Sequence, residues 1–266
     1  MNSNRSAALP ALARTLSIIL TLTGLFGAST NSFAADVRLA VAANFTDTTR
    51  ELIRAFAKTS GLEASASFGS TGKLYAQIEH GAPFDVFMAA DSRRPQLLET
   101  SGQGVAGTRF TYARGRLVLW SPEPGAFADG KDWLSQGQFD RLAIANPKTA
   151  PYGLAARQAL TKAGLWQPLQ AKLVRGDSIA QTFQFVASGN AQAGLIALSQ
   201  ALAWKRNSGT LWSVPQEDYA PIDQQAILLT RSQDKEAARQ WLEFLVSPEA
   251  RAIIASYGYD TPSLTP

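Results

Sequence analysis

After residue 34, short apolar runs alternate with amphipathic helical patterns, and this alternation limits the architectures that the chain can adopt. The run Val37 to Ala43 is typical of a buried strand. The pattern after it places Leu52, Ile53 and Phe56 on one helix face and stops at Gly61, a common helix end. Strands and helices that alternate in this way predict an α/β fold with largely parallel strands.

The alternation occurs in two series, which predicts two α/β lobes. We expect lobe 1 to comprise residues 35–115 plus 221–266 and lobe 2 to comprise residues 116–220, so that the chain crosses between them twice. The two C-terminal helices would cover lobe 1, and a ligand cleft would lie between the lobes. The strands expected are 37–43, 62–68, 84–90, 116–120, 142–145, 171–174, 193–198 and a less regular strand within 219–230.

The first 34 residues have the composition of a secretory signal. Arg5 and Arg14 come before an apolar run from Leu16 to about Ala28. Ser32 and Ala34 are small residues two positions apart, and we expect cleavage after Ala34. The apolar run is too short for a typical membrane span. These features predict an exported, soluble, periplasmic chain with residues 1–34 removed.

Charge and cysteine content exclude several classes of function. The formal charge of +4 falls to +2 without Arg5 and Arg14, and no basic run remains, so we expect no nucleic-acid partner. The sequence contains no cysteine, which rules out disulfides, thiol catalysis, thiolate metal sites and a lipid-modified cysteine.

Four predicted helices begin after loops of small, mostly polar residues, and each lobe has two such loops. Helix starts present unpaired N–H groups and the positive end of the helix dipole, so four of them around one cleft would bind an anion without a basic side chain. Taken one at a time, Asn44, Ser70 and Asp177 are also ordinary helix caps. The loops are 43–46, 69–72, 150–153 and 176–179.

The stretch Ser67 to Lys73, SFGSTGK, is compatible with three chemistries. A nucleotide-binding P-loop needs glycine at the first position and Ser or Thr after the lysine, and the chain has Ser67 and Leu74 there. Ser70 and Lys73 have the Ser-x-x-Lys spacing of acylating enzymes, but the other motifs of that class are missing. An anion-binding loop is the leading interpretation, and an exported Ser70 hydrolase is the alternative from another class. The single histidine, His80, falls at a helix end, where capping is its expected role.

Four stretches of the chain resemble periplasmic molybdate-binding proteins of ABC importers, which belong to the type II extracellular solute-binding proteins. The stretches are AVAANFTDT, SFGSTGKLYAQIEHGAPFDVFMAAD, LAIANPKTAPYGLAARQAL and GDSIAQTFQFVASGNAQAGLIALSQ, with a solute-binding-protein ending in SPEARAIIASYGY. The resemblance implies a type II periplasmic binding protein fold, a bound molybdate or tungstate, delivery to a membrane permease, a monomer, and neither enzymatic activity nor a cofactor. Molybdenum would be bound only as the oxyanion.

The resemblance also implies the positions of the ligand-binding residues. They are Asn44, Ser70, Thr71, Tyr152 and Ile179, with Ala43 and Ser178 as possible additions. Many relatives carry a tyrosine at the position of Ala197, which has no side-chain donor.

The chemistry of the ligand agrees with donor loops. Molybdate and tungstate are dianions with four acceptor oxygens and no proton near neutral pH, so they suit a site made only of donors. Phosphate keeps a proton and needs an acceptor. Sulfate is also acceptor-only, and a sulfate or other tetrahedral-oxyanion receptor remains an alternative at this stage.

Overall fold

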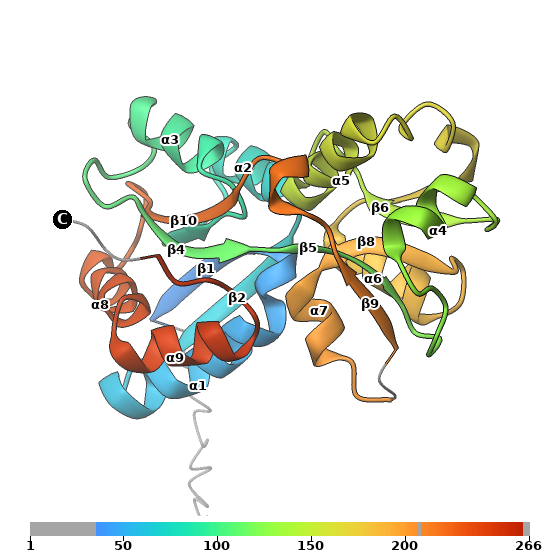
Figure 1. The fold of residues 1–266 in the computed structure, drawn as a ribbon. Helices are drawn as coiled ribbons and strands as arrows, with labels where there is room; N and C mark the ends of the chain where they lie inside the picture. Colours follow the sequence, from blue (N-terminus) through green and yellow to red (C-terminus); the bar gives the residue numbers. More distant parts are fainter. Residues whose placement is uncertain (1–35, 207–208, 263–266) are drawn as a thin grey trace, which may run out of the picture. The chain divides into compact units, whose positions relative to one another are not determined.

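The described residues form two five-stranded mixed sheets with helices packed against them (Figure 1). The structure is a computed structural model, and it describes residues 36–206 and 209–262. The expected secretory segment and its cleavage site near Ala34 lie outside these residues. Among the described residues, no helix has the length and apolar character needed to cross a bilayer.

The first sheet has the strand order β2-β1-β3-β10-β4. β1 pairs in parallel with β2 and β3, whereas β10 runs antiparallel to both β3 and β4. Because the carboxyl ends of β1 and β2 lie at one edge, the loops that follow them are neighbours. The strands are β1 (Val37–Ala42), β2 (Ala64–Gly69), β3 (Val86–Met88), β4 (Phe110–Gly115) and β10 (Ile222–Leu228).

The second sheet repeats this plan with the order β7-β6-β8-β5-β9. β6 pairs in parallel with β7 and β8, and β5 runs antiparallel to β8 and β9. Arg116 alone separates β4 of the first sheet from β5 of the second, so one of the two passages between sheets is nearly direct. The strands are β5 (Leu117–Ser121), β6 (Leu142–Ala145), β7 (Leu173–Gly176), β8 (Ala193–Ala197) and β9 (Thr210–Ser213).

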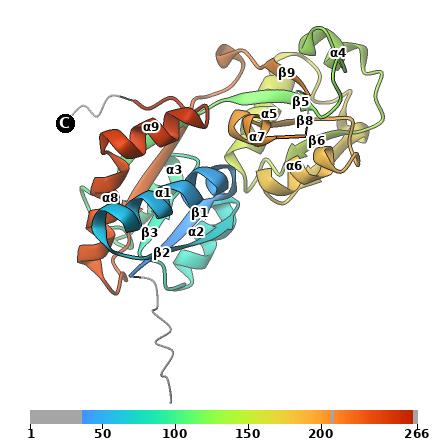
Figure 2. The same cartoon turned by 90° about the horizontal axis from the view of Figure 1, so that it is seen from below.

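Helices cover the faces of both sheets. The two C-terminal helices pack with α1 on the first sheet, as expected from the sequence, and Figure 2 shows α1, α8 and α9 gathered beside β1. Phe56 of α1 meets Trp241 of α8 edge to face, with ring centroids 5.1 Å apart. The helices are α1 (Thr46–Ser60), α2 (Thr71–Glu79), α3 (Arg93–Thr100), α4 (Gly130–Gln136), α5 (Pro151–Lys162), α6 (Ile179–Ala187), α7 (Leu198–Ala203), α8 (Lys235–Leu245) and α9 (Pro248–Ser256), with short 3₁₀ turns η1 (Ala43–Phe45), η2 (Gln170–Lys172) and η3 (Gln216–Asp218).

The structure differs from the sequence-based expectation in several elements. The third strand is shorter than 84–90, and β4, β9, α3, α4 and α7 were not predicted. β4 contains Thr111 and Arg114 among its apolar residues, and α3 contains three charged residues, so neither has a strong apolar period. Tertiary pairing with β10 makes β4 a strand in spite of this weak pattern.

Candidate functional site

A small cavity lies where strands and helices of both sheets meet. Its volume is about 10 Å³, close to the smallest volume that holds one water molecule. No charged side chain is among the described residues that line it. They are Ala42, Ala43, Asn44, Gly69, Ser70, Thr71, Ala90, Ala150, Pro151, Tyr152 and Ile179. The structure therefore brings together six of the seven candidate residues, and Ser178 is the one that does not line the cavity.

The loop before α2 supplies two hydroxyl groups to this cavity. Ser70 is the N-cap residue of α2, yet its Oγ caps no backbone N–H, is buried and has no hydrogen-bond partner. Thr71 Oγ1 accepts a hydrogen bond from the backbone N–H of Ala90 at 3.1 Å, so its own proton remains available to an acceptor. Ser70 is thus not an ordinary side-chain cap.

The glycine of this loop brings the two sheets into contact. The N–H of Gly72 donates to the carbonyl of Thr149 at 2.8 Å. A Cβ atom at Gly72 would lie only 2.9 Å from that carbonyl oxygen. Glycine at position 72 is therefore required by the close approach of the Thr149 backbone.

Asn44 lines the cavity, but its side-chain amide is committed elsewhere. Nδ2 donates to Gln224 Oε1 at 2.8 Å and to the Tyr259 hydroxyl at 3.1 Å. The Asn44 carbonyl accepts from Ser199 Oγ of α7 at 3.1 Å. Both amide hydrogens of the side chain are used inside the protein, so the group that Asn44 can offer to a ligand is its backbone N–H.

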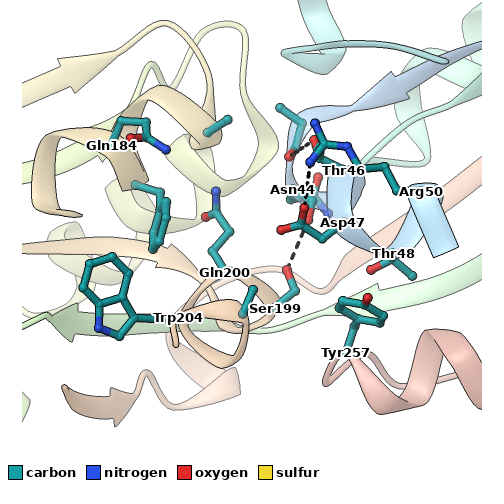
Figure 3. A pocket seen from close by; sticks show the side chains of 14 residues that line it. Asn44, Thr46, Asp47, Thr48, Arg50, Gln184, Ser199, Gln200, Trp204 and Tyr257 are labelled. Atoms are coloured by element: carbon teal, nitrogen blue, oxygen red, sulfur yellow. Dashed lines mark hydrogen bonds and ion pairs between the residues drawn. The ribbon is translucent and has the colours of Figure 1, made fainter. Parts of the chain in front are cut away.

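Beyond Asn44 lies a second, larger pocket of about 310 Å³. Figure 3 shows Asn44 and Asp47 on one side of it and Ser199, Gln200 and Trp204 on the other. Unlike the small cavity, this pocket has charged side chains in its wall. Asn44 lines both the pocket and the small cavity, and its contact with Ser199 joins the η1 turn to α7.

The second sheet contributes two helix starts. Pro151 occupies the first turn of α5, where its missing N–H removes no helical bond. A Cβ at Gly153 would lie 2.2 Å from the carbonyl oxygen of Ala145, so glycine lets α5 begin directly against the end of β6. This close packing places Tyr152 at the cavity.

The start of α6 is held by side chains that do not line the cavity. Ser178 is the N-cap, and its Oγ accepts from the backbone N–H of Gln181 at 3.3 Å. Gln200 accepts from the N–H of Ala197 and donates to the carbonyl of Ile179. Ser178 and Gln200 therefore fix the backbone of the loop, and Ile179 is the residue of this loop at the cavity.

The Tyr152 hydroxyl is buried and has no hydrogen-bond partner. Burial, followed by the nearby Tyr259, Tyr219 and Tyr112, raises the pKa of Tyr152 well above its ordinary value. Tyr152 is consequently neutral at physiological pH and keeps its proton.

Lys73 does not act on Ser70. Its Nζ atom forms an ion pair with Asp177 Oδ2 at 2.7 Å, and both side chains are more than half exposed. This lysine joins α2 to the loop before α6. His80 contacts the Ala76 carbonyl at the end of α2, in agreement with the expected capping role.

The carboxylates at the two ends of β3 are used in structural contacts. Asp91 pairs with Arg94, and Asp85, at the end of β3 away from the cavity, is 1% exposed and paired with Arg38. Within residues 36–206 and 209–262, no cluster of three or more His, Cys, Asp or Glu side chains could hold a metal ion.

Sequence reasoning missed the residues behind the cavity, above all Gln224, Tyr259 and Ser199. Gln224 is fully buried in the centre of β10. The irregular alternation of IDQQAIL was the available signal, since a glutamine at an inward position of an apolar strand needs a hydrogen-bond partner.

The fold and the site together define a class of protein. Two mixed sheets with covering helices are linked by short passages, and a cavity without charged side chains lies where strands of both sheets lead into helices. The chain belongs to the bacterial extracellular solute-binding protein family, whose sequence model matches residues 37–260. This confirms the resemblance seen in the sequence.

Individual relatives carry a more specific description. The chain is 50% identical over 227 residues to the molybdate-binding protein of Azotobacter vinelandii, which covers 85% of the chain and 90% of that relative. It is 43% identical over 237 residues to the molybdate-binding protein of Rhodobacter capsulatus, with 89% and 93% covered.

Solved structures confirm the type II periplasmic binding protein fold. The periplasmic molybdate-binding protein of Azotobacter vinelandii superposes with a TM-score of 0.82 at 40% identity, covering 85% of this chain and 99% of that one. A sulfate-binding protein from Mycobacterium tuberculosis matches with a TM-score of 0.73 at 15% identity, covering 86% and 87%. The second match concerns the fold alone.

Proposed function

We propose that this protein is the periplasmic solute receptor of an ABC importer and that it binds molybdate, and with it tungstate, in the small cavity. The observation that carries the proposal is the buried, unpartnered hydroxyl of Ser70 in a cavity lined by uncharged residues and helix starts. A buried hydroxyl without a partner costs about 1–3 kcal/mol, which an anion oxygen would offset. The molybdate-binding relatives support the choice of ligand.

The ligand-binding groups would come from both sheets. Ser70 and Thr71 would donate through their hydroxyls, and the backbone N–H groups at Asn44, Tyr152 and Ile179 would add donors at helix starts. The Ala43 backbone would complete the wall. Ser178 would support the site through its cap, without touching the ion.

A donor-only site would select against protonated anions. Hydrogen phosphate has a proton to donate, and no carboxylate lines the cavity to accept it. Sulfate has the same acceptor-only character as molybdate and differs in size, so it is the competing ligand. The receptor would have no catalytic role, because Ser70 lacks a general base within hydrogen-bond reach and Lys73 is paired with Asp177.

Entry of the anion would require the two lobes, residues 35–115 plus 221–266 and residues 116–220, to separate. The cavity is about the size of one water molecule and smaller than a tetrahedral oxyanion, and contacts such as Gly72–Thr149 and Lys73–Asp177 join the two lobes. Rotation about the passages near residues 115 and 220 would open it. The closed complex would then dock on the membrane permease as a monomer.

Titration of the protein without its first 34 residues tests this proposal. Molybdate, tungstate, sulfate and phosphate are added in turn, and binding is followed by calorimetry and Trp fluorescence. We expect micromolar or tighter molybdate and tungstate binding and no phosphate binding. Sulfate binding without a molybdate response would exclude the molybdate assignment, and a covalent adduct of Ser70 with a phosphonate probe would favour the hydrolase.

A further inference from the structure

Two buried polar groups from different sheets lack partners at the passage between the sheets. One is the hydroxyl of Tyr152 at the start of α5, and the other is Nε2 of Gln224 on β10. Both residues are at most 1% exposed, so solvent satisfies neither. Unpaired groups of this kind are rare in protein interiors and call for an explanation.

Both groups border the same point, next to Gly115. A Cβ atom built on Gly115 would lie 2.0 Å from the Tyr152 hydroxyl oxygen and 3.2 Å from Gln224 Nε2. Gly115 is the last residue of β4, immediately before the passage to the second sheet. The missing side chain at Gly115 thus leaves the space in which the two groups approach each other.

The orientation of the Gln224 amide is set by its other end. Oε1 accepts hydrogen bonds from Asn44 Nδ2 at 2.8 Å and from the Tyr112 hydroxyl at 3.4 Å. A flipped amide would set Nε2 against Asn44 Nδ2, donor against donor. Nε2 is therefore the end that borders Gly115 and Tyr152, with the Tyr259 hydroxyl as a second neighbour, and it can only donate.

The Tyr152 oxygen is a suitable acceptor for this donor. A phenolic hydroxyl accepts a hydrogen bond while it keeps its own proton for another partner. Tyr152 and Asn44 both line the small cavity, whereas Gln224 does not. Gln224 thus bonds Asn44 and borders Tyr152, and these two residues of the cavity wall belong to different lobes.

From this arrangement, which rests on the proposed function, we propose that Gln224 is a positioning residue for anion binding. In the anion-bound state its Nε2 donates to the Tyr152 hydroxyl while its Oε1 holds Asn44. One buried amide then couples the ligand-binding loops of the two lobes without touching the anion. Gly115 is the residue that makes this contact sterically possible.

A double-mutant cycle tests the coupling. The variants are Gln224→Leu, Tyr152→Phe and the double variant, and the dissociation constant for sodium molybdate is measured for each. We expect Gln224→Leu to weaken binding about tenfold in the wild-type background. In the Tyr152→Phe background the loss should be smaller by about fivefold, because the hydroxyl that accepts the bond is already gone.

Gln225→Leu is the matched control. Gln225 is the next residue on β10, and its side chain bonds Arg109 and Thr111 away from the cavity. Its loss should lower stability in the way that any lost hydrogen bond does, and it should leave the molybdate dissociation constant within about twofold of wild type. A purely structural role of Gln224 would give the same pattern as this control.

Each outcome decides the proposal. Coupling between Gln224 and Tyr152 in molybdate binding supports it, and additive losses overturn it. If the wild-type protein binds no molybdate, the molybdate assignment fails, and the same cycle is then measured with tungstate or sulfate, whichever the titration shows to bind. Coupling in the dissociation constant of that anion supports the Tyr152–Gln224 bond, and additive losses, or a protein that binds none of these anions, overturn it.

Discussion

Two buried polar clusters in this protein differ in one respect, which is whether their hydrogen bonds are complete. Asp85 accepts bonds from the backbone and side chain of Arg38, from Ser232 Oγ and from the N–H of Gln233. At the small cavity, the hydroxyls of Ser70 and Tyr152 accept and donate nothing.

Buried polar groups therefore have different roles in the two clusters. A complete set of bonds ties β1 and β3 to the segment after β10 and stabilises the fold. An incomplete set leaves donors ready for a ligand, at a cost in stability that the ligand offsets. Substitutions should separate these two roles.

The largest effect is expected from Asp85→Asn. It removes the charge that Arg38 faces in a buried pair, so the free energy of unfolding should fall by about 3–5 kcal/mol. Chemical denaturation measures this change, and molybdate affinity of the folded variant should stay unchanged. Asp223→Asn is the control, because its pair with Arg114 is substantially exposed and should contribute less than about 1 kcal/mol. Equal losses at both sites would contradict the distinction.

Gly115→Ala should affect both stability and binding. Its Cβ would collide with the Tyr152 hydroxyl, and overpacking of this kind costs about 1–3 kcal/mol. The second substitution Tyr152→Phe should restore part of the stability, because it removes the atom nearest to the new methyl group. Thermal unfolding of the single and double variants gives the answer, and an absence of any relief would place the strain elsewhere.

Ser70→Ala and Thr71→Ala should weaken molybdate binding by about 1–3 kcal/mol each, the loss typical of a donor to a charged acceptor. They should differ in stability. Ser70→Ala removes an unpartnered hydroxyl and should leave the melting temperature unchanged or higher, whereas Thr71→Ala also removes the acceptor of the Ala90 N–H. Calorimetry and thermal unfolding measure the two effects. Unchanged affinity in both variants would remove this loop from the site.

Lowering the pH should destabilise the fold through the Asp85 cluster, whose hydrogen bonds are complete, before it affects the small cavity. Burial favours protonation of Asp85, but the bonds from Arg38, Gln233 and Ser232 outweigh it and lower the pKa below 3.8. A lowered carboxyl pKa stabilises the fold above the unfolded value, and this contribution is lost as pH falls below about 4 through the folded value, by up to about 1.4 kcal/mol per pH unit. Denaturation midpoints of wild type and Asp85→Asn between pH 6 and pH 2 should converge. A constant difference would show that Asp85 does not titrate in this range.

Lys73→Ala should have the smallest effect. Its ion pair with Asp177 crosses between the sheets but is exposed, and such pairs contribute less than about 1 kcal/mol. Molybdate affinity should fall at most about fivefold, and less at 0.5 M NaCl than at low salt. A loss as large as that of Thr71→Ala would indicate a charge-driven site.

The sequence predicted most of the helices and strands, and six of the seven site residues that the family resemblance implied line one cavity. Signals were strong where the period was strong, as in α1, α6 and α8, and at glycines such as Gly61 that end helices with positive φ. β4 was missed because its strand state depends on pairing with β10. Gln224 was missed because its partners are 112 and 180 positions away in the chain.

By itself, the sequence determined the α/β class, the two series of strands and the polar helix starts, because these follow from local apolar periodicity and capping chemistry. Only the tertiary structure decided which polar groups are satisfied. Asn44 and Ser70 are both small polar residues at helix starts, yet the fold gives the Asn44 amide two acceptors and leaves Ser70 with none. Whether a buried group stabilises the fold or waits for a ligand depends on atoms brought to it from distant parts of the chain.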